Sequence, residues 1–215
     1  MYLTIIGATG ATGKNLLEMA LKDDYFTKVD VFVRRNVSLS NEKLTVHVID
    51  FDKPDEWEKN VTGDVLFSCL GTTRRDAGGK KSQWKVDYDY QYRFAKAASE
   101  KGVQNYVLVS SDFASSKSIF FYTKMKGKLE DEIIKLGFRK IIIFRPPAME
   151  RENSDRPAEA LGIKIIRFLN SIGILKSFAP LRTDKLAEAM INALKRLPDG
   201  VHIISRNEIS NYTNK

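Results

Sequence analysis

The sequence contains few of the residues that bind metals or form disulfides. Its 215 residues include one cysteine, Cys69, and two histidines, His47 and His202. A single cysteine excludes an intramolecular disulfide, and no second histidine or cysteine stands at ligand spacing from either histidine. The composition therefore indicates a reducing compartment and predicts no metal site.

Long apolar segments are also missing. Stretches such as KIIIF and NYVLV have the length of strands, so the sequence predicts no transmembrane helix. The first strand begins near Tyr2, with no basic region and apolar segment of a signal peptide ahead of it. We therefore expect a cytoplasmic protein.

Runs of five or more basic residues are absent, although the net charge is +8. Lysine and arginine are spread along the whole chain, which disfavours a nucleic-acid surface or a membrane surface. A phosphorylated ligand and a merely solvated basic surface remain as explanations of the charge.

Strand-like and helical patterns alternate along most of the chain. Apolar runs recur at YLTIIG, KVDVFVR, LTVHVID, DVLFSCL, NYVLVSS and KIIIFRP, with helical patterns between most of them. Runs this apolar are expected in strands that are covered on both faces. The sequence thus predicts an α/β protein of the Rossmann type, a doubly wound parallel sheet in one domain over residues 1–215.

The pattern changes after Pro146. Helices are predicted over 161–175 and 183–197, and a short strand over 201–205. This C-terminal part, roughly 147–215, is too small to form a separate domain. We expect it to pack at the carboxyl edge of the sheet and to form a wall of a substrate pocket.

A glycine-rich turn follows the first strand in IIGATGATGKN. Gly7 can allow the sharp turn out of the strand, Gly10 the close approach of a pyrophosphate, and Gly13 tight packing of the helix on the sheet. The spacing is GxxGxxG rather than the usual GxGxxG. Because the turn lies between a strand and a helix, it predicts a dinucleotide on the helix N-terminus.

The end of the second strand indicates which dinucleotide binds. A site for NAD would place a carboxylate there, whereas this sequence has Arg34 and Arg35. Arginine offers planar paired donors to phosphate, so the two residues favour NADP(H), with solvated arginines as the alternative. Asp50 and Phe51, at the end of the third strand, are placed to contact adenine.

Tyr122 and Lys126 are four residues apart in a predicted helix and so share one face. Free tyrosine is a weak acid–base group at neutral pH, and a nearby ammonium group favours its phenolate. Ser110 and Ser111 end the preceding strand, where neighbouring side chains point in opposite directions. We expect Ser111 to face the site and to hold the substrate oxygen that Tyr122 protonates.

In combination, GATGATG, VRR, CLGTTRR, VDYDY, LVSS, YTKMK and FRP resemble the short-chain dehydrogenase/reductase superfamily. The likeness is to its atypical branch, specifically to the Tat-interacting oxidoreductase-like proteins, which bind NADPH and include regulatory members. It covers most of the chain. In one departure, Pro147 stands where related sequences tend to have glycine.

The resemblance also implies roles for individual residues. The pyrophosphate would be bound by Gly7, Thr9, Gly10, Ala11, Thr12 and Gly13. Arg34 would bind the 2′-phosphate, and Cys69, Leu70 and Gly71 would line the adenine ribose and its surroundings. Pro146 would lie at the nicotinamide end, and the catalytic group would be Ser111, Tyr122 and Lys126.

These observations favour an NADPH-dependent oxidoreductase acting on a small carbonyl or alcohol. A non-catalytic regulatory protein that senses NADPH and binds a protein partner is the alternative, and a sugar-nucleotide epimerase would need a larger C-terminal part. The basic residues of the loop GTTRRDAGGKKSQW suit either an anionic substrate or a solvated loop. Substrate identity and oligomeric state are not predicted.

Overall fold

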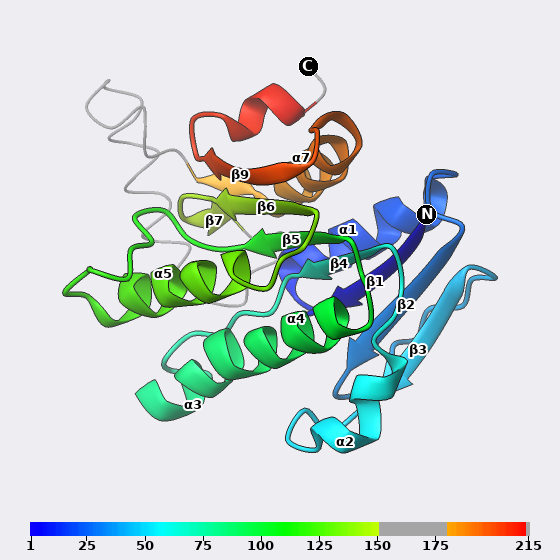
Figure 1. Cartoon of the computed structure of the whole chain (residues 1–215), viewed down its shortest axis with the longest axis horizontal. Coiled ribbons are helices and arrows are strands. Elements are labelled where there is room, and N and C mark those ends of the chain that lie inside the picture. Colours follow the sequence, from blue (N-terminus) through cyan, green and yellow to red (C-terminus); the bar gives the residue numbers. More distant parts are fainter. Residues whose placement is uncertain (151–179, 214–215) are drawn as a thin grey trace.

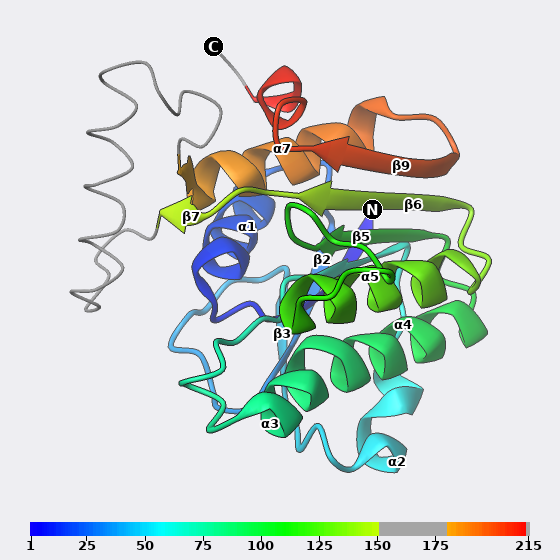
Figure 2. The same cartoon turned by 90° about the vertical axis from the view of Figure 1, so that its left-hand side faces the viewer.

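The computed structural model describes residues 1–150 and 180–213 (Figures 1 and 2). The strands are β1 Tyr2–Ile6, β2 Lys28–Val33, β3 Leu44–Val48, β4 Val65–Ser68, β5 Asn105–Val109, β6 Lys140–Arg145, β7 Met149–Glu150, β8 Leu181–Arg182 and β9 Gly200–Ser205. The α-helices are α1 Ala11–Lys22, α2 Pro54–Trp57, α3 Lys80–Trp84, α4 Tyr90–Glu100, α5 Phe121–Ile134 and α7 Thr183–Arg196. A π-helical turn, η2, spans Lys85–Asp89, and 3₁₀ turns span Glu58–Asn60 and Ile209–Tyr212.

The main sheet has seven strands in the order β3-β2-β1-β4-β5-β6-β9, and every neighbouring pair is parallel. This order confirms the predicted dinucleotide-binding topology. Strands are added from β1 toward β3 on one side, and from β4 toward β9 on the other. The carboxyl ends of β1 and β4 therefore flank a crevice, which is where such sheets bind ligands.

Helices cover both faces of the sheet, which gives the molecule three layers. Figure 1 shows α4 and α5 on one side and α1 and α7 on the other. One core packs side chains of α1 and α7 on the sheet, and a second packs side chains of α4 and α5 on the opposite face. Burial on both faces explains why β1, β4, β5 and β6 are so continuously apolar.

Asp30 is the one charged residue among the buried residues of β2, and its role is structural. Its Oδ2 accepts a hydrogen bond of 2.7 Å from the Tyr2 hydroxyl and lies 2.8 Å from His47 Nε2. The side chain thus joins β1, β2 and β3 near the start of β2. It lies at the opposite end of the strand from Arg34.

The C-terminal part extends the sheet. Helix α7 packs on α1, and β9 pairs with β6 along its length, from Lys140 opposite Gly200 to Arg145 opposite Ser205. These elements therefore complete the main fold, and Met149, from the same C-terminal part, lines a cavity beside the turn between β1 and α1. The helix predicted over 161–175 lies outside the described residues. None of the described helices is long and apolar enough to cross a membrane.

Candidate functional site

The turn between β1 and α1 depends on two glycines. Gly7 has a φ of +82°, and a Cβ atom there would lie 2.5 Å from the carbonyl carbon of Cys69. A Cβ atom on Gly13 would lie 2.1 Å from the carbonyl oxygen of Gly7. Gly7 thus permits the sharp turn and Gly13 the close packing of α1, as the sequence predicted.

Gly10 differs because the protein itself leaves space around it. A Cβ atom there would meet only the carbonyl oxygens of Gly7, at 3.3 Å, and Cys69, at 3.9 Å. Gly10 is the N-cap of α1, has no side chain to cap the helix, and no acidic residue lies in the first turn. The free N–H groups and the positive end of the helix dipole therefore fit a phosphate group at this position.

Two cavities meet beside this turn. One of about 550 Å³ includes Arg34, Phe51 and Tyr90 in its lining, and the other, of about 430 Å³, includes Tyr122, Lys126 and Met149. Both are lined by Gly10, Cys69, Leu70, Gly71, Thr72 and Asp76. We call them the adenosine cavity and the reaction cavity. Their arrangement suits an elongated ligand whose middle lies at Gly10.

The lining of the adenosine cavity distinguishes residues that the sequence alone could not distinguish. Arg34 lines it, whereas its neighbour Arg35 does not. Phe51 also lines it, whereas Asp50 is exposed and uses its Oδ1 to accept the backbone N–H of Asp52 at 2.9 Å. Arg34 and Phe51 are therefore the better placed candidates for ligand contact.

The reaction cavity contains the predicted tyrosine and lysine. Tyr122, in the first turn of α5, is 38% exposed, and its hydroxyl makes no hydrogen bond with the described residues. Lys126, one turn later, is only 2% exposed, and its Nζ donates to the carbonyl oxygen of Val109 at 3.4 Å. A buried ammonium group and an accessible phenol thus line the same cavity as the glycine turn.

Lys126 has an ionic partner that the sequence analysis did not identify. The Nζ atom lies 3.5 Å from Oδ1 of Asp87, whose side chain is completely buried. Asp87 Oδ2 accepts the backbone N–H of Thr72 at 3.0 Å, whereas Oδ1 has no hydrogen-bond partner in the described structure. Burial raises the pKa of the Asp87 carboxyl, and the charge of Lys126 opposes that increase.

Asp87 lies in the π-helical turn η2. This turn widens the helix between α3 and α4, and the carbonyl oxygen of Asp87 accepts the side-chain amide of Gln91 at 2.9 Å. The other side-chain atom of Gln91 accepts the Ser68 hydroxyl at 2.7 Å, which ties the turn to β4. Turns of this kind occur often at functional sites. The segment VDYDY contributes to the family resemblance, but it does not itself reveal the ion pair between Asp87 and Lys126.

The two serines after β5 point to different partners. The Ser110 hydroxyl donates to Oε1 of Glu130, a buried carboxylate that also binds Arg145. The Ser111 hydroxyl donates to the carbonyl oxygen of Asp112 at 3.1 Å. The Ser110 hydroxyl is therefore occupied by Glu130. Of the residues predicted at the reactive end of the site, neither Ser111 nor Pro146 lines the reaction cavity.

Cys69 contributes through its backbone. Its carbonyl group packs against Gly7 and Gly10, whereas burial raises the pKa of its thiol to about 12. A thiol of this kind stays protonated at neutral pH and does not act as a nucleophile. Among the described residues, no group of three or more histidine, cysteine, aspartate or glutamate side chains could hold a metal ion.

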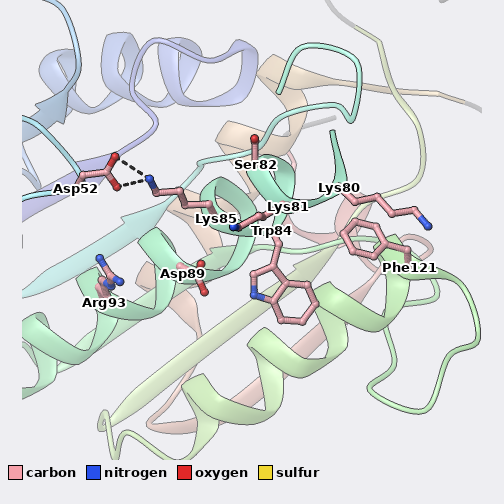
Figure 3. Close-up of a pocket in the computed structure, with 9 residues that line it drawn as sticks. All are labelled: Asp52, Lys80, Lys81, Ser82, Trp84, Lys85, Asp89, Arg93 and Phe121. Atoms are coloured by element: carbon pink, nitrogen blue, oxygen red, sulfur yellow. Dashed lines mark hydrogen bonds and ion pairs between the residues drawn. The ribbon is translucent and has the colours of Figure 1, made fainter. Parts of the chain in front are cut away.

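A third cavity, of about 900 Å³, lies beside α3 and α4 (Figure 3). Figure 3 shows Lys85 directed at Asp52, and their ion pair measures 2.7 Å. Lys80 extends over the ring of Phe121, with 5.5 Å between Nζ and the ring centroid. Tyr122 and the glycine turn do not line this cavity, although Ser82 and Lys85 line both it and the adenosine cavity.

Comparison with known proteins supports the dinucleotide assignment. Residues 7–162 match a family model described as NAD(P)H-binding. The mitochondrial protein FMP52 of Saccharomyces cerevisiae is 38% identical over 175 residues, which are 76% of this chain and 75% of that protein. Mitochondrial FMP52-2 of Scheffersomyces stipitis is 33% identical over 98% of this chain and 97% of its own length.

Solved structures give the same fold. The oxidoreductase ylbE of Lactococcus lactis is 25% identical, with a TM-score of 0.58 over 72% of this chain and 73% of its own. A UDP-glucose 4-epimerase of Thermotoga maritima has a TM-score of 0.71 at 12% identity, over all of this chain and 84% of its own. At that identity, the likeness to the epimerase concerns the fold alone.

The comparisons also correct one expectation. The sequence led us to expect a cytoplasmic protein, whereas the curated relatives are named as mitochondrial. The expectation was wrong because a signal-peptide pattern distinguishes exported proteins from others and does not separate mitochondria from cytoplasm.

Proposed function

Because the chain belongs to the NAD(P)H-binding family, as an atypical short-chain dehydrogenase/reductase-like protein, we propose that it is an NADPH-dependent oxidoreductase acting on a small carbonyl or alcohol. One observation carries the proposal: Tyr122 and Lys126 line the same cavity as the glycine turn. A cofactor bound there along the turn would bring its reactive end to a proton donor.

The residues of the reaction cavity have distinct tasks in this proposal. Tyr122 donates a proton to the carbonyl oxygen, and the nearby charge of Lys126 stabilises the phenolate that remains. Asp87 holds Lys126 in place through their ion pair. When bound, the nicotinamide supplies the hydride for the carbonyl carbon, while the protein orients the reactants.

Turnover is the direct test of this function. The purified protein is incubated with NADPH and a panel of aldehydes and ketones, both neutral and carboxylate-bearing, and oxidation of the cofactor is followed by absorbance. We expect reduction of at least some members. Binding of NADPH without any turnover, together with binding of a protein partner that depends on NADPH, would instead support a regulatory sensor.

The choice of cofactor leads to a prediction on Arg34. NADPH is expected to bind more tightly than NADH, because Arg34 lines the adenosine cavity and can bind the 2′-phosphate. Arg34→Ala should weaken NADPH binding by roughly ten- to a hundredfold, the scale of hydrogen bonds to a charged group, and leave NADH unchanged. Fluorescence titration measures both affinities.

Arg35→Ala is the matched control, since Arg35 is the adjacent exposed arginine and does not line the cavity. It should change neither affinity by much. Equal weakening of NADPH and NADH by Arg34→Ala would contradict the 2′-phosphate assignment, as would a larger effect of Arg35→Ala.

The names of the relatives support a mitochondrial location for this protein as well. The protein is expected to co-sediment with mitochondria when cells that express it at its native level are fractionated. Recovery in the post-mitochondrial supernatant, with matrix and membrane markers retained in the pellet, would argue against this location.

A further inference from the structure

The structure separates the four basic residues of the loop after β4. Arg74 lines the reaction cavity, together with Tyr122. Lys80 and Lys81 instead line the cavity of Figure 3. Arg75 lines neither of these cavities nor the adenosine cavity. The loop therefore presents a single arginine to the site.

Hydrogen bonds hold the loop that carries Arg74. The backbone N–H of Thr72 donates to Asp87, and its carbonyl oxygen accepts the side chain of Gln83 at 3.1 Å. Beyond it, Ala77 N donates to Thr73 O at 2.9 Å and Gly79 N to Arg74 O at 3.0 Å. The loop that carries Arg74 is therefore anchored at Thr72 by the same carboxylate that pairs with Lys126.

Within the part of the chain that the structure describes, Arg74 has no counter-ion. Lys126 faces Asp87, and Asp76 has an interaction of its own. The guanidinium of Arg74 forms no hydrogen bond or ion pair with residues 1–150 or 180–213. A guanidinium in this setting offers paired donors to a planar oxyanion.

We propose that Arg74 binds an anionic group of the substrate, so that the protein acts on small oxo acids or hydroxy acids in preference to neutral carbonyls. The inference rests on the proposed function and adds the substrate class. Arg74 lines the reaction cavity and not the adenosine cavity, which has Arg34 for a phosphate. A carboxylate bound by Arg74 leaves the adjoining carbonyl group for Tyr122.

The test compares charged and neutral probes of the same shape. Glyoxylate, pyruvate and phenylglyoxylate are each paired with their amides, and their binding is measured by calorimetry with and without NADP⁺. The wild-type protein is expected to prefer the acids. Arg74→Gln should weaken binding of the acids by roughly ten- to a hundredfold, the scale of hydrogen bonds to a charged group, and leave the amides unchanged.

Arg75→Gln is the control, because it removes the adjacent charge from the same loop and should change neither class. Equal binding of acids and amides by the wild-type protein overturns the inference. An Arg74→Gln variant that loses NADPH affinity and keeps the preference for acids shows that Arg74 binds a cofactor phosphate instead. Failure of the proposed function is seen separately, as absent NADPH binding or absent reduction of every carbonyl tested.

Discussion

Replacement of Tyr122 by phenylalanine is expected to lower NADPH-dependent carbonyl reduction by about two to four orders of magnitude, the usual scale of acid–base assistance. The change removes one oxygen atom and keeps the ring. Because that hydroxyl makes no hydrogen bond with the described residues and the side chain is 38% exposed, stability should change by no more than about 0.5 kcal/mol. NADPH affinity should fall only slightly.

The measurement is kcat and kcat/KM with a saturating cofactor, beside a fluorescence titration of NADPH. Tyr92→Phe, on α4 and outside the reaction cavity, is the control and should retain full activity. Undiminished turnover in the Tyr122→Phe variant would falsify the assigned proton donor. It would not contradict the assignment of the dinucleotide site, because that assignment depends on the glycine turn and on Arg34.

The second large effect is expected from Lys126→Met. This change leaves the carboxylate of Asp87 buried without its counter-ion, and breaking a buried pair in this way typically costs about 3 to 5 kcal/mol. Lys124→Met, which removes an exposed lysine from the same helix, should stay within about 0.5 kcal/mol. Urea unfolding at neutral pH measures both.

Two further results distinguish an uncompensated charge from lost packing. Addition of Asp87→Asn to Lys126→Met should recover most of the loss, because the amide oxygen still accepts the Thr72 N–H and no charge stays buried. Without Lys126, burial holds the folded-state pKa of Asp87 further above its ordinary value. Protons then bind the folded protein more tightly, so the unfolding free energy of the variant rises as the pH falls through that window.

The deficit of Lys126→Met relative to wild type should therefore be smaller at about pH 5 than at about pH 7. A deficit that is independent of pH and persists in the double variant would mean that the aliphatic packing of Lys126, rather than its charge, holds this part of the fold.

The parts of the site that could be predicted are those encoded at short range. Gly7, Gly10 and Gly13 follow one strand directly, Tyr122 and Lys126 are one helical turn apart, and sequence spacing alone brings each group together. The order of the strands in the sheet could also be predicted, because alternating apolar and helical runs allow few topologies.

The rest depends on contacts between distant segments. Asp87 meets Lys126 only because a π-helical turn and α5 pack side by side, and no local pattern reports that contact. Arg74 and Arg75 are adjacent and chemically identical, so only the folded loop shows which of them faces the cavity. The strand β9 was recognised, but its pairing with β6 requires the position of α7 on α1.

The turn η2 also makes the site sensitive to the length of the chain. A deletion of one residue within Lys85–Asp89 would allow ordinary α-helical pitch to continue from α3 into α4. The segment before the deletion would then rotate by about 100° relative to α4, the angle per residue of an α-helix. Asp87 would leave Lys126, and the loop bearing Arg74 would lose its anchor at Thr72, although no residue that lines the reaction cavity had been replaced.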